Sequence, residues 1–196
     1  MRVMVTQKIE SKNIYYPPGG MLLWIIIFLE LITFGMALIA MVYSGRLEPE
    51  VFHTSRLLLN PIYGTINTLF LLSSGFFMVV SLENLKAGEK EKSLRFLAAT
   101  MLFGILFLVV KAIEYSVKLD AGLTLGYNTF FTFYWLLTLF HVIHVIVGLV
   151  ILTSIYFGVK KEKSGTTIED VEASAAFWHM CDLIWLLLFP IIYLLF

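Results

Sequence analysis

Two histidines three residues apart, His141 and His144, lie in a stretch without a charged residue between positions 128 and 159. At this spacing both imidazoles lie on one face of a helix. Imidazole is a common metal and haem ligand as well as a hydrogen-bonding group. The pair therefore indicates either a cofactor site or a contact that holds helices together.

Two further pairs of ionisable residues lie in apolar stretches, Lys111 with Glu114 and His179 with Asp182. An ionisable group at the centre of a membrane helix costs about 2.5–3.5 kcal/mol on insertion scales, so such groups usually face the bundle interior and bond to one another. We expect Lys111 and Glu114, near the outer end of their span, to form an i,i+3 ion pair with some snorkelling of the lysine. We expect His179 and Asp182 to form a hydrogen-bonded helix clamp.

Glu30 has no charged neighbour on its own apolar stretch and should lie near mid-depth. Its partner must come from another helix, and His141 and His144 are the candidates. Such a pair would either share a proton in a buried hydrogen bond or keep the carboxyl group neutral. His53, between the first two apolar stretches, is expected to be exposed.

A cofactor site is the alternative for the histidines. A zinc site needs three or four ligands, and Cys181 is the only cysteine, so a cysteine cluster is excluded. His141 and His144 point the same way and cannot take opposite axial positions of one haem, but either could straddle a haem with His179. The expectation is a structural role, with no metal ligands and no catalytic residues in this chain.

The composition shows which elements must position these residues. The chain has 196 residues, 59% hydrophobic and 14% charged, and a mean hydropathy of +0.87, which is far from the composition of soluble domains. A bilayer core takes about 20 apolar residues in a helix. The sequence therefore predicts an all-α integral membrane bundle: an N-terminal arm over 1–20 and a five-helix domain over 21–196, with spans at about 21–43, 61–82, 94–117, 128–157 and 173–196.

Lysines and arginines predict the orientation, because cytoplasmic loops carry an excess of them. Ten lie in the N-terminal arm and in the connections after the second and fourth spans, and four lie toward the opposite side. We expect a cytoplasmic N-terminus, an outer C-terminus, and a multi-pass protein of a bacterial-type plasma (inner) membrane. Zero net charge gives no reason to expect nucleic acid, and loops of about 20 residues or fewer leave no soluble catalytic domain and no soluble substrate.

Small residues predict close helix packing. Gly148 lies one turn beyond His144 on the same face, and Ser73, Ser74 and Gly75 lie in the middle of the second span.

Five stretches, in order, resemble the haem-copper oxidase subunit III family, the cytochrome c oxidase subunit 3-like proteins. Paired histidines followed by Val and Gly precede a last helix with Trp-His-x-x-Asp-x-x-Trp in that family. Glu30 resembles the glutamate of the helix that heads the shared five-helix core. The stretches are FLELITFG (28–35), NTLFLLSSG (67–75), AIEYSVKLDAG (112–122), FHVIHVIVG (140–148) and AAFWHMCDLIWLLLFPIIY (175–193).

The resemblance implies an accessory subunit with no haem or copper of its own. It would pack on the catalytic subunit I, which holds both, stabilise that subunit, and support its proton uptake and oxygen access in aerobic electron transport, with membrane lipid as its surroundings. The interior polar set would be Glu30, Glu114, His141, His144, His179 and Asp182, with Trp178, Trp185 and Gly148 packed beside it.

Classical members of the family carry two more N-terminal helices, which form a lipid-filled cleft against the other five. A five-helix chain resembles both short bacterial oxidase forms and the accessory subunit of nitric oxide reductases, so the residues leave oxygen or nitric oxide as the acceptor of the complex. Two further alternatives are a membrane electron-transfer protein with a bis-histidine haem and a small transporter built around the buried charges.

Overall fold

The computed structural model describes residues 19–161 and 166–196, and in these residues it is helical without strands. Five of the helices are long and apolar enough to cross a membrane, which confirms the predicted all-α membrane fold. Most of the predicted N-terminal arm lies outside the described residues. The helices are α1 (Gly20–Leu47), α2 (Pro49–Leu57), α3 (Pro61–Lys86), α4 (Lys90–Asp120), α5 (Thr129–Lys160) and α6 (Ile168–Tyr193).

Capping side chains fix where three of the long helices begin. Asn60 accepts a hydrogen bond from the backbone of α3, and Asn128 accepts one from the N–H of Phe131 in α5 at 2.9 Å. Thr167 and Asp170 form a capping box at the start of α6. Each cap satisfies backbone donors that the first helical turn leaves unpaired.

Most ends of the long helices extend beyond the predicted spans, whereas α6 ends at Tyr193, before the predicted end at 196. With 32 residues, α5 is about 48 Å long at 1.5 Å per residue, against a hydrocarbon core of about 30 Å. Its ends therefore reach the interfacial regions. Hydrophobicity marks only the part of a helix that lies among acyl chains, which is why the predicted spans were shorter.

One helix was not predicted. Pro49 stands at the first position of α2, a nine-residue helix that buries Phe52 and Ser55. This helix is too short and too polar to be recognised from the sequence as a membrane span. His53 on its outer face is exposed, as expected.

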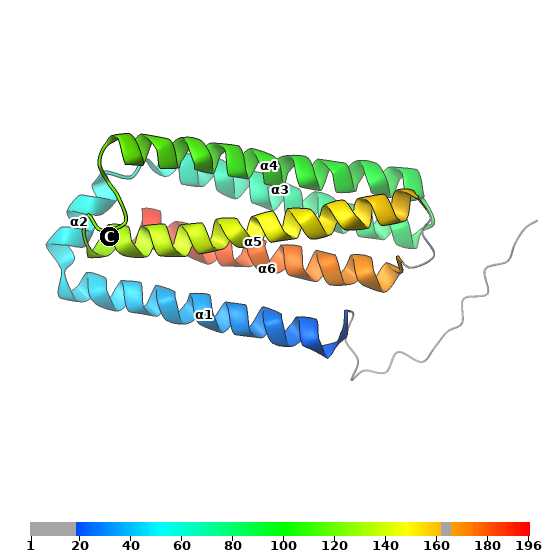
Figure 1. Ribbon diagram of the computed structural model, residues 1–196, viewed down its shortest axis with the longest axis horizontal. Coiled ribbons are helices and arrows are strands. Elements are labelled where there is room, and N and C mark those ends of the chain that lie inside the picture. The colour runs from blue at the N-terminus through cyan, green and yellow to red at the C-terminus, as the bar shows by residue number, and fades with distance from the viewer. Residues whose placement is uncertain (1–18, 162–165) are drawn as a thin grey trace, which may run out of the picture.

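The long helices lie side by side along the longest axis of the molecule (Figure 1). The hairpin of α3 and α4 packs most closely, α5 and α6 lie against it, and α1 packs on α5 and α6 at the periphery. The short α2 lies at the same end of the bundle as the C-terminus (Figure 1). Segments far apart in sequence therefore enclose a common core.

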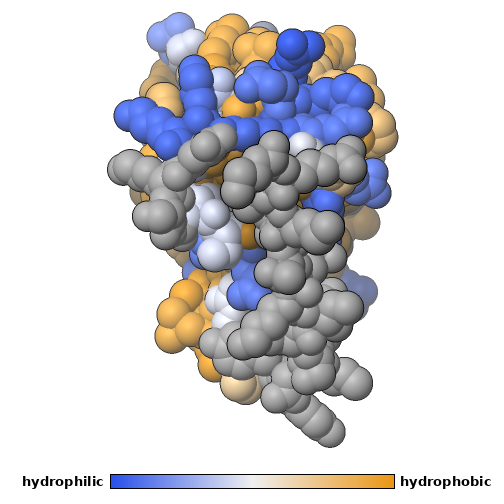
Figure 2. Space-filling model, turned by 90° about the vertical axis from the view of Figure 1, so that its right-hand side faces the viewer, coloured by the Kyte–Doolittle hydropathy of each residue, from blue (hydrophilic) through white to orange (hydrophobic). Residues whose placement is uncertain are grey.

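Polar side chains gather at the opposite end, where α3 turns into α4 and α5 connects to α6. Figure 2 looks onto this end and shows hydrophilic residues over it, with hydrophobic residues on the flanks. Lys86 on α3 and Glu172 on α6 form an ion pair across it at 2.6 Å.

The core and the outer surface are both apolar. Trp178, Trp185, Phe107 and Tyr134 are fully buried, whereas leucines, isoleucines and phenylalanines on the outer faces of every long helix are more than one-third exposed. Apolar exposure on this scale fits contact with acyl chains rather than with water.

Candidate functional sites within the bundle

The deepest polar cluster lies between α4, α5 and α6. The ammonium group of Lys111 lies 2.8 Å from Oε2 of Glu114 and donates to the hydroxyl of Tyr193 at 2.9 Å. Tyr193 in turn donates to Oε1 of Glu114 at 2.7 Å. The side chains of Lys111 and Glu114 are each 1% exposed. Three bonds thus close a ring of partners that water and lipid do not reach.

Two neighbouring groups extend this cluster. Lys118 lies one turn beyond Glu114, 3.5 Å from Oε1 and also buried, so the carboxylate faces two ammonium groups. Four aromatic rings surround Lys111 with centroids at 5.1–5.6 Å, those of Tyr115, Tyr134, Trp185 and Tyr193. Ring faces attract a cation, most strongly where water is excluded.

The predicted ion pair between Lys111 and Glu114 is confirmed, but the expected snorkelling of Lys111 was wrong. The side chain of Lys111 turns into the bundle because its ammonium group bonds there to a carboxylate and two hydroxyl groups and lies over aromatic rings. Inward bonds of this kind replace the hydration that snorkelling would preserve.

Glu30 and His144 form the second site, which joins α1 to α5. The carboxylate Oε2 of Glu30 lies 3.3 Å from Nε2 of His144, close enough for an ion pair although the two are not aligned as a hydrogen bond. Nδ1 of His144 lies 2.8 Å from the carbonyl oxygen of Phe140, so Nδ1 carries a proton and donates it. The other ring nitrogen, Nε2, is the one that faces the carboxyl group. Of the two partners predicted for Glu30, the structure selects His144.

His141 lies one turn away but has a different role. Its ring is fully buried, and neither nitrogen has a hydrogen-bond partner among the described residues. Phe34, Phe107 and Trp185 enclose it, with ring centroids 6.4, 5.6 and 5.3 Å away. The imidazole therefore serves as an aromatic packing unit that links α5 to α1, α4 and α6.

His179 and Asp182 form the third site, on the face of α6 that meets α3. Their Nδ1 and Oδ2 atoms are 3.4 Å apart, which confirms the predicted pairing. Gly75 on α3 makes room for it, because a Cβ atom there would run into the Asp182 carboxylate. The side chain of His179 is 41% exposed, so only part of this pair belongs to the interior.

The two tryptophans that flank this pair join α6 to α3. The indole of Trp178 donates to the hydroxyl of Ser74 at 3.1 Å, and that of Trp185 donates to Thr68 at 3.0 Å. Gly148 on α5 leaves space for the ring of Trp178. Buried indole N–H groups usually find such partners.

The residues of the expected interior polar set are distributed over separate places in the bundle. They are three separate sites with an aromatic core between them. The sequence patterns did not reveal the bonding roles of five residues, Lys118, Tyr134, Tyr193 and the α3 hydroxyl residues Thr68 and Ser74. Lys118 alone carried a signal, since it lies four residues after Glu114; the tyrosines come from other helices, and no local spacing reveals them.

Haem or metal ligation was the alternative for the histidines. Among residues 19–161 and 166–196, no group of three or more His, Cys, Asp or Glu side chains is placed to hold a metal ion. His141 stacks on Trp185, which is six residues from His179 and so about 120° away around α6. His144 faces α1 instead. The paired histidines and His179 thus do not face a common space that a haem could fill.

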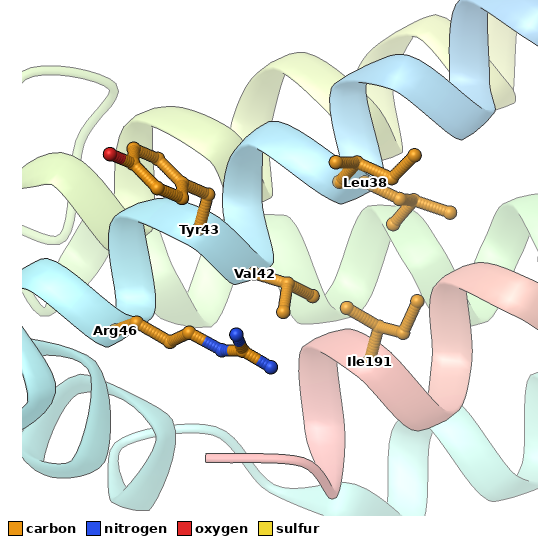
Figure 3. Close-up of a pocket in the computed structure, with 6 residues that line it drawn as sticks. Leu38, Val42, Tyr43, Arg46 and Ile191 are labelled. Atoms are coloured by element: carbon orange, nitrogen blue, oxygen red, sulfur yellow. The ribbon is translucent and has the colours of Figure 1, made fainter.

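An apolar groove of about 310 Å³ runs between α1 and the last turns of α6 (Figure 3). Leu38 and Val42 line it from α1 and Ile191 from α6, and the guanidinium group of Arg46 extends across one end. The groove offers one cationic group and little other polarity.

The helices and sites define a class: an integral membrane protein of five spans whose buried polar side chains bond mainly to one another across helices. The sequence model of cytochrome c oxidase subunit III matches residues 19–195. The chain belongs to the cytochrome c oxidase subunit III family.

Curated relatives agree with this assignment. Cytochrome c oxidase subunit 3 of Synechocystis is 32% identical over 132 residues, which cover 66% of this chain and 55% of the relative. Cytochrome bo(3) ubiquinol oxidase subunit 3 of Buchnera aphidicola is 29% identical over 88% of this chain and 84% of its own length. Heme-copper oxidase subunit I+III of Aeropyrum pernix is 28% identical over 88% of this chain and 22% of its own length. The chain spans about half the length of several curated relatives that it matches.

Proposed function

We propose that this protein is a non-catalytic accessory subunit of a haem-copper terminal oxidase in aerobic electron transport. In this role it packs on the catalytic subunit and stabilises it, supports proton uptake and oxygen access, and binds neither haem nor copper itself. The observation that carries the proposal is the family match over residues 19–195, which includes all three polar sites.

The arrangement of the deepest site supports a bracing role. Lys111, Glu114 and Tyr193 bond to one another inside the bundle, and a group committed in this way is not available to a substrate. The other two sites join α1 to α5 and lie between α6 and α3. The contacts at all three sites are therefore consistent with a role in holding the helices in position.

The name of the Aeropyrum relative supports the choice of partner. It places subunits I and III in one protein, and two units joined in one chain are held at high effective concentration. We infer that the present chain makes the corresponding contact as a separate subunit, with subunit I as its partner.

We propose that the chain lies in a plasma membrane of the bacterial type, and the charge distribution supports a cytoplasmic position for one end of the bundle. Lys86, Lys92 and Arg95 lie near the α3–α4 turn and Lys160 and Lys161 at the end of α5, all at one end of the bundle. Toward the other end lie Arg46, Arg56 and Lys118, of which Lys118 is buried against Glu114. By the positive-inside rule, this distribution favours a cytoplasmic position for the α3–α4 turn.

The test is purification of the tagged full chain from its native membranes in mild detergent. We expect it to copurify in a 1:1 ratio with a larger subunit that contains haem and copper. After separation, the optical spectrum and metal content should follow the larger subunit. Stoichiometric haem in the separated chain, or an intact preparation without any haem protein, would refute the proposal.

A further inference from the structure

A second groove, of about 350 Å³, lies between α3 and α6 on the outside of the bundle. Its floor is Gly75 with the His179–Asp182 pair. Its walls are apolar side chains that are each more than one-third exposed, Leu72, Phe76 and Val79 on α3 and Leu183 and Leu186 on α6.

The groove lies at the middle of the membrane. His179 is 11 residues from the first residue of α6 and 14 from the last, so it lies about 17 Å and about 21 Å from the two ends of the helix. Gly75 likewise lies in the middle of α3. In a hydrocarbon core about 30 Å thick, only acyl chains are available from lipids at this depth.

His179 differs in one respect from the other ionisable residues inside the membrane-spanning helices. The side chains of Lys111 and Glu114 are 1% exposed, those of His144 and Glu30 are 11% and 24% exposed, and that of His179 is 41% exposed. Its Nδ1 atom faces Asp182, and within residues 19–161 and 166–196 no group bonds to Nε2. One polar edge of the ring is therefore directed out of this chain.

An ionisable side chain at mid-membrane normally faces the interior of a bundle or a water-filled cavity, and rarely acyl chains. Gly75 contributes to a fixed orientation of the His179 imidazole, because the absence of a side chain there lets the Asp182 carboxylate lie beside the ring. A carboxylate that fixes Nδ1 leaves Nε2 as the position for a bond outside the chain. A hydroxyl or carboxamide group suits this position, because both can donate and accept a hydrogen bond.

We propose that the groove between α3 and α6 receives a transmembrane helix of the partner subunit, which places a hydroxyl or carboxamide side chain against Nε2 of His179. The partner helix covers the apolar walls and completes an interior around the imidazole. This proposal rests on the proposed function, since it assigns the face by which the accessory subunit binds its partner.

The first experiment uses the intact complex purified from native membranes, with a photoreactive benzoylphenylalanine at one position at a time. Probes at Phe76 and Leu183, on opposite walls of the groove, should cross-link to a transmembrane segment of the partner subunit. An intact complex in which neither probe reaches the partner would overturn the docking site but leave the proposed function standing. If both probes cross-linked only to a bound small molecule, such as a quinone, the docking site would also be overturned. Failure to obtain any complex counts against the proposed function instead.

The second experiment tests the imidazole. His179→Leu should lower the fraction of the chain that stays in the complex at a fixed detergent concentration by about ten-fold, and His179→Gln should restore most of it. The matched control is His53→Leu at an exposed position on α2, which should change retention less than two-fold. Unfolding of each separated variant shows whether the chain itself is intact. Equal losses for His179→Leu and His53→Leu, or no rescue by glutamine in a folded chain, would refute the role of Nε2.

Discussion

Removal of the Glu114 carboxylate should destabilise the bundle more than removal of the Lys111 ammonium group. Glu114→Gln leaves two buried ammonium groups without an anion, because Lys111 and Lys118 both face this carboxylate. Loss of one partner of a buried pair costs about 3–5 kcal/mol. Lys111→Met leaves Glu114 with Lys118 at 3.5 Å and the Tyr193 hydroxyl at 2.7 Å. Its cost should be about 1.5–3 kcal/mol, typical of a lost hydrogen bond to a charged group.

The assay is SDS-induced unfolding of the purified full chain in mixed micelles, with tryptophan fluorescence as the signal because the Trp185 ring lies 5.2 Å from the ammonium group of Lys111. The double variant with both changes completes a thermodynamic cycle. It should cost less than the sum of the single changes by about 2 kcal/mol, because no unpaired Lys111 remains.

An exposed pair with the same spacing provides the control. Glu89 and Lys92 are also three residues apart, with Nζ–Oε2 2.5 Å, but their side chains are 46% and 62% exposed. Glu89→Gln should therefore change the free energy of unfolding by only about 0–1 kcal/mol. The reasoning fails if Lys111→Met costs as much as Glu114→Gln, or if the cycle shows no coupling.

Three smaller changes test the helix contacts by the same assay. Glu30→Gln should be tolerated within about 1 kcal/mol, whereas Glu30→Leu should cost about 1–3 kcal/mol because it leaves Nε2 of His144 without a polar partner. Gly75→Ala should cost about 1–3 kcal/mol, since the added methyl group would displace the Asp182 carboxylate. Thr167→Ala should cost about 0.5–2 kcal/mol through loss of the cap of α6.

Each of these has an outcome that contradicts it. Equal losses from Gln and Leu at position 30 would show that the carboxyl group needs no polar replacement. Gly35 has no atom near the position of an added Cβ, so Gly35→Ala should be neutral or stabilising. A loss at Gly75 no greater than at Gly35 would exclude the steric explanation. Retention of full stability by Thr167→Ala would show that the cap is redundant.

Much of the fold could be predicted from the sequence, because each span is a continuous apolar run whose length must match the membrane. The i,i+3 pairs could be predicted as well, because one helix supplies both partners and its periodicity brings them together. Glu30 could be matched to a histidine only by depth, since both residues were expected near the middle of the membrane.

Contacts that depend on how helices rotate about their axes could not be predicted. The inward turn of Lys111 depends on Tyr193, 82 residues away, and Tyr134, 23 residues away. The packing role of His141 depends on rings from three other helices. The spacing of hydrophobic residues did not indicate which side of each helix faces the core, because the spans are apolar on both their lipid-facing and protein-facing sides. The short helix α2 was missed for a different reason, because its nine residues are too few and too polar to be recognised as a membrane span.

The peripheral position of α1 has a consequence for biosynthesis. This helix leaves the ribosome before the other described helices, yet the long helices on which it packs, α5 and α6, are synthesised last. The α3–α4 hairpin can assemble as soon as it enters the bilayer, because its two helices are adjacent in the chain. The first span must wait in the lipid, with Glu30 lacking its imidazole, until about 100 further residues have been translated.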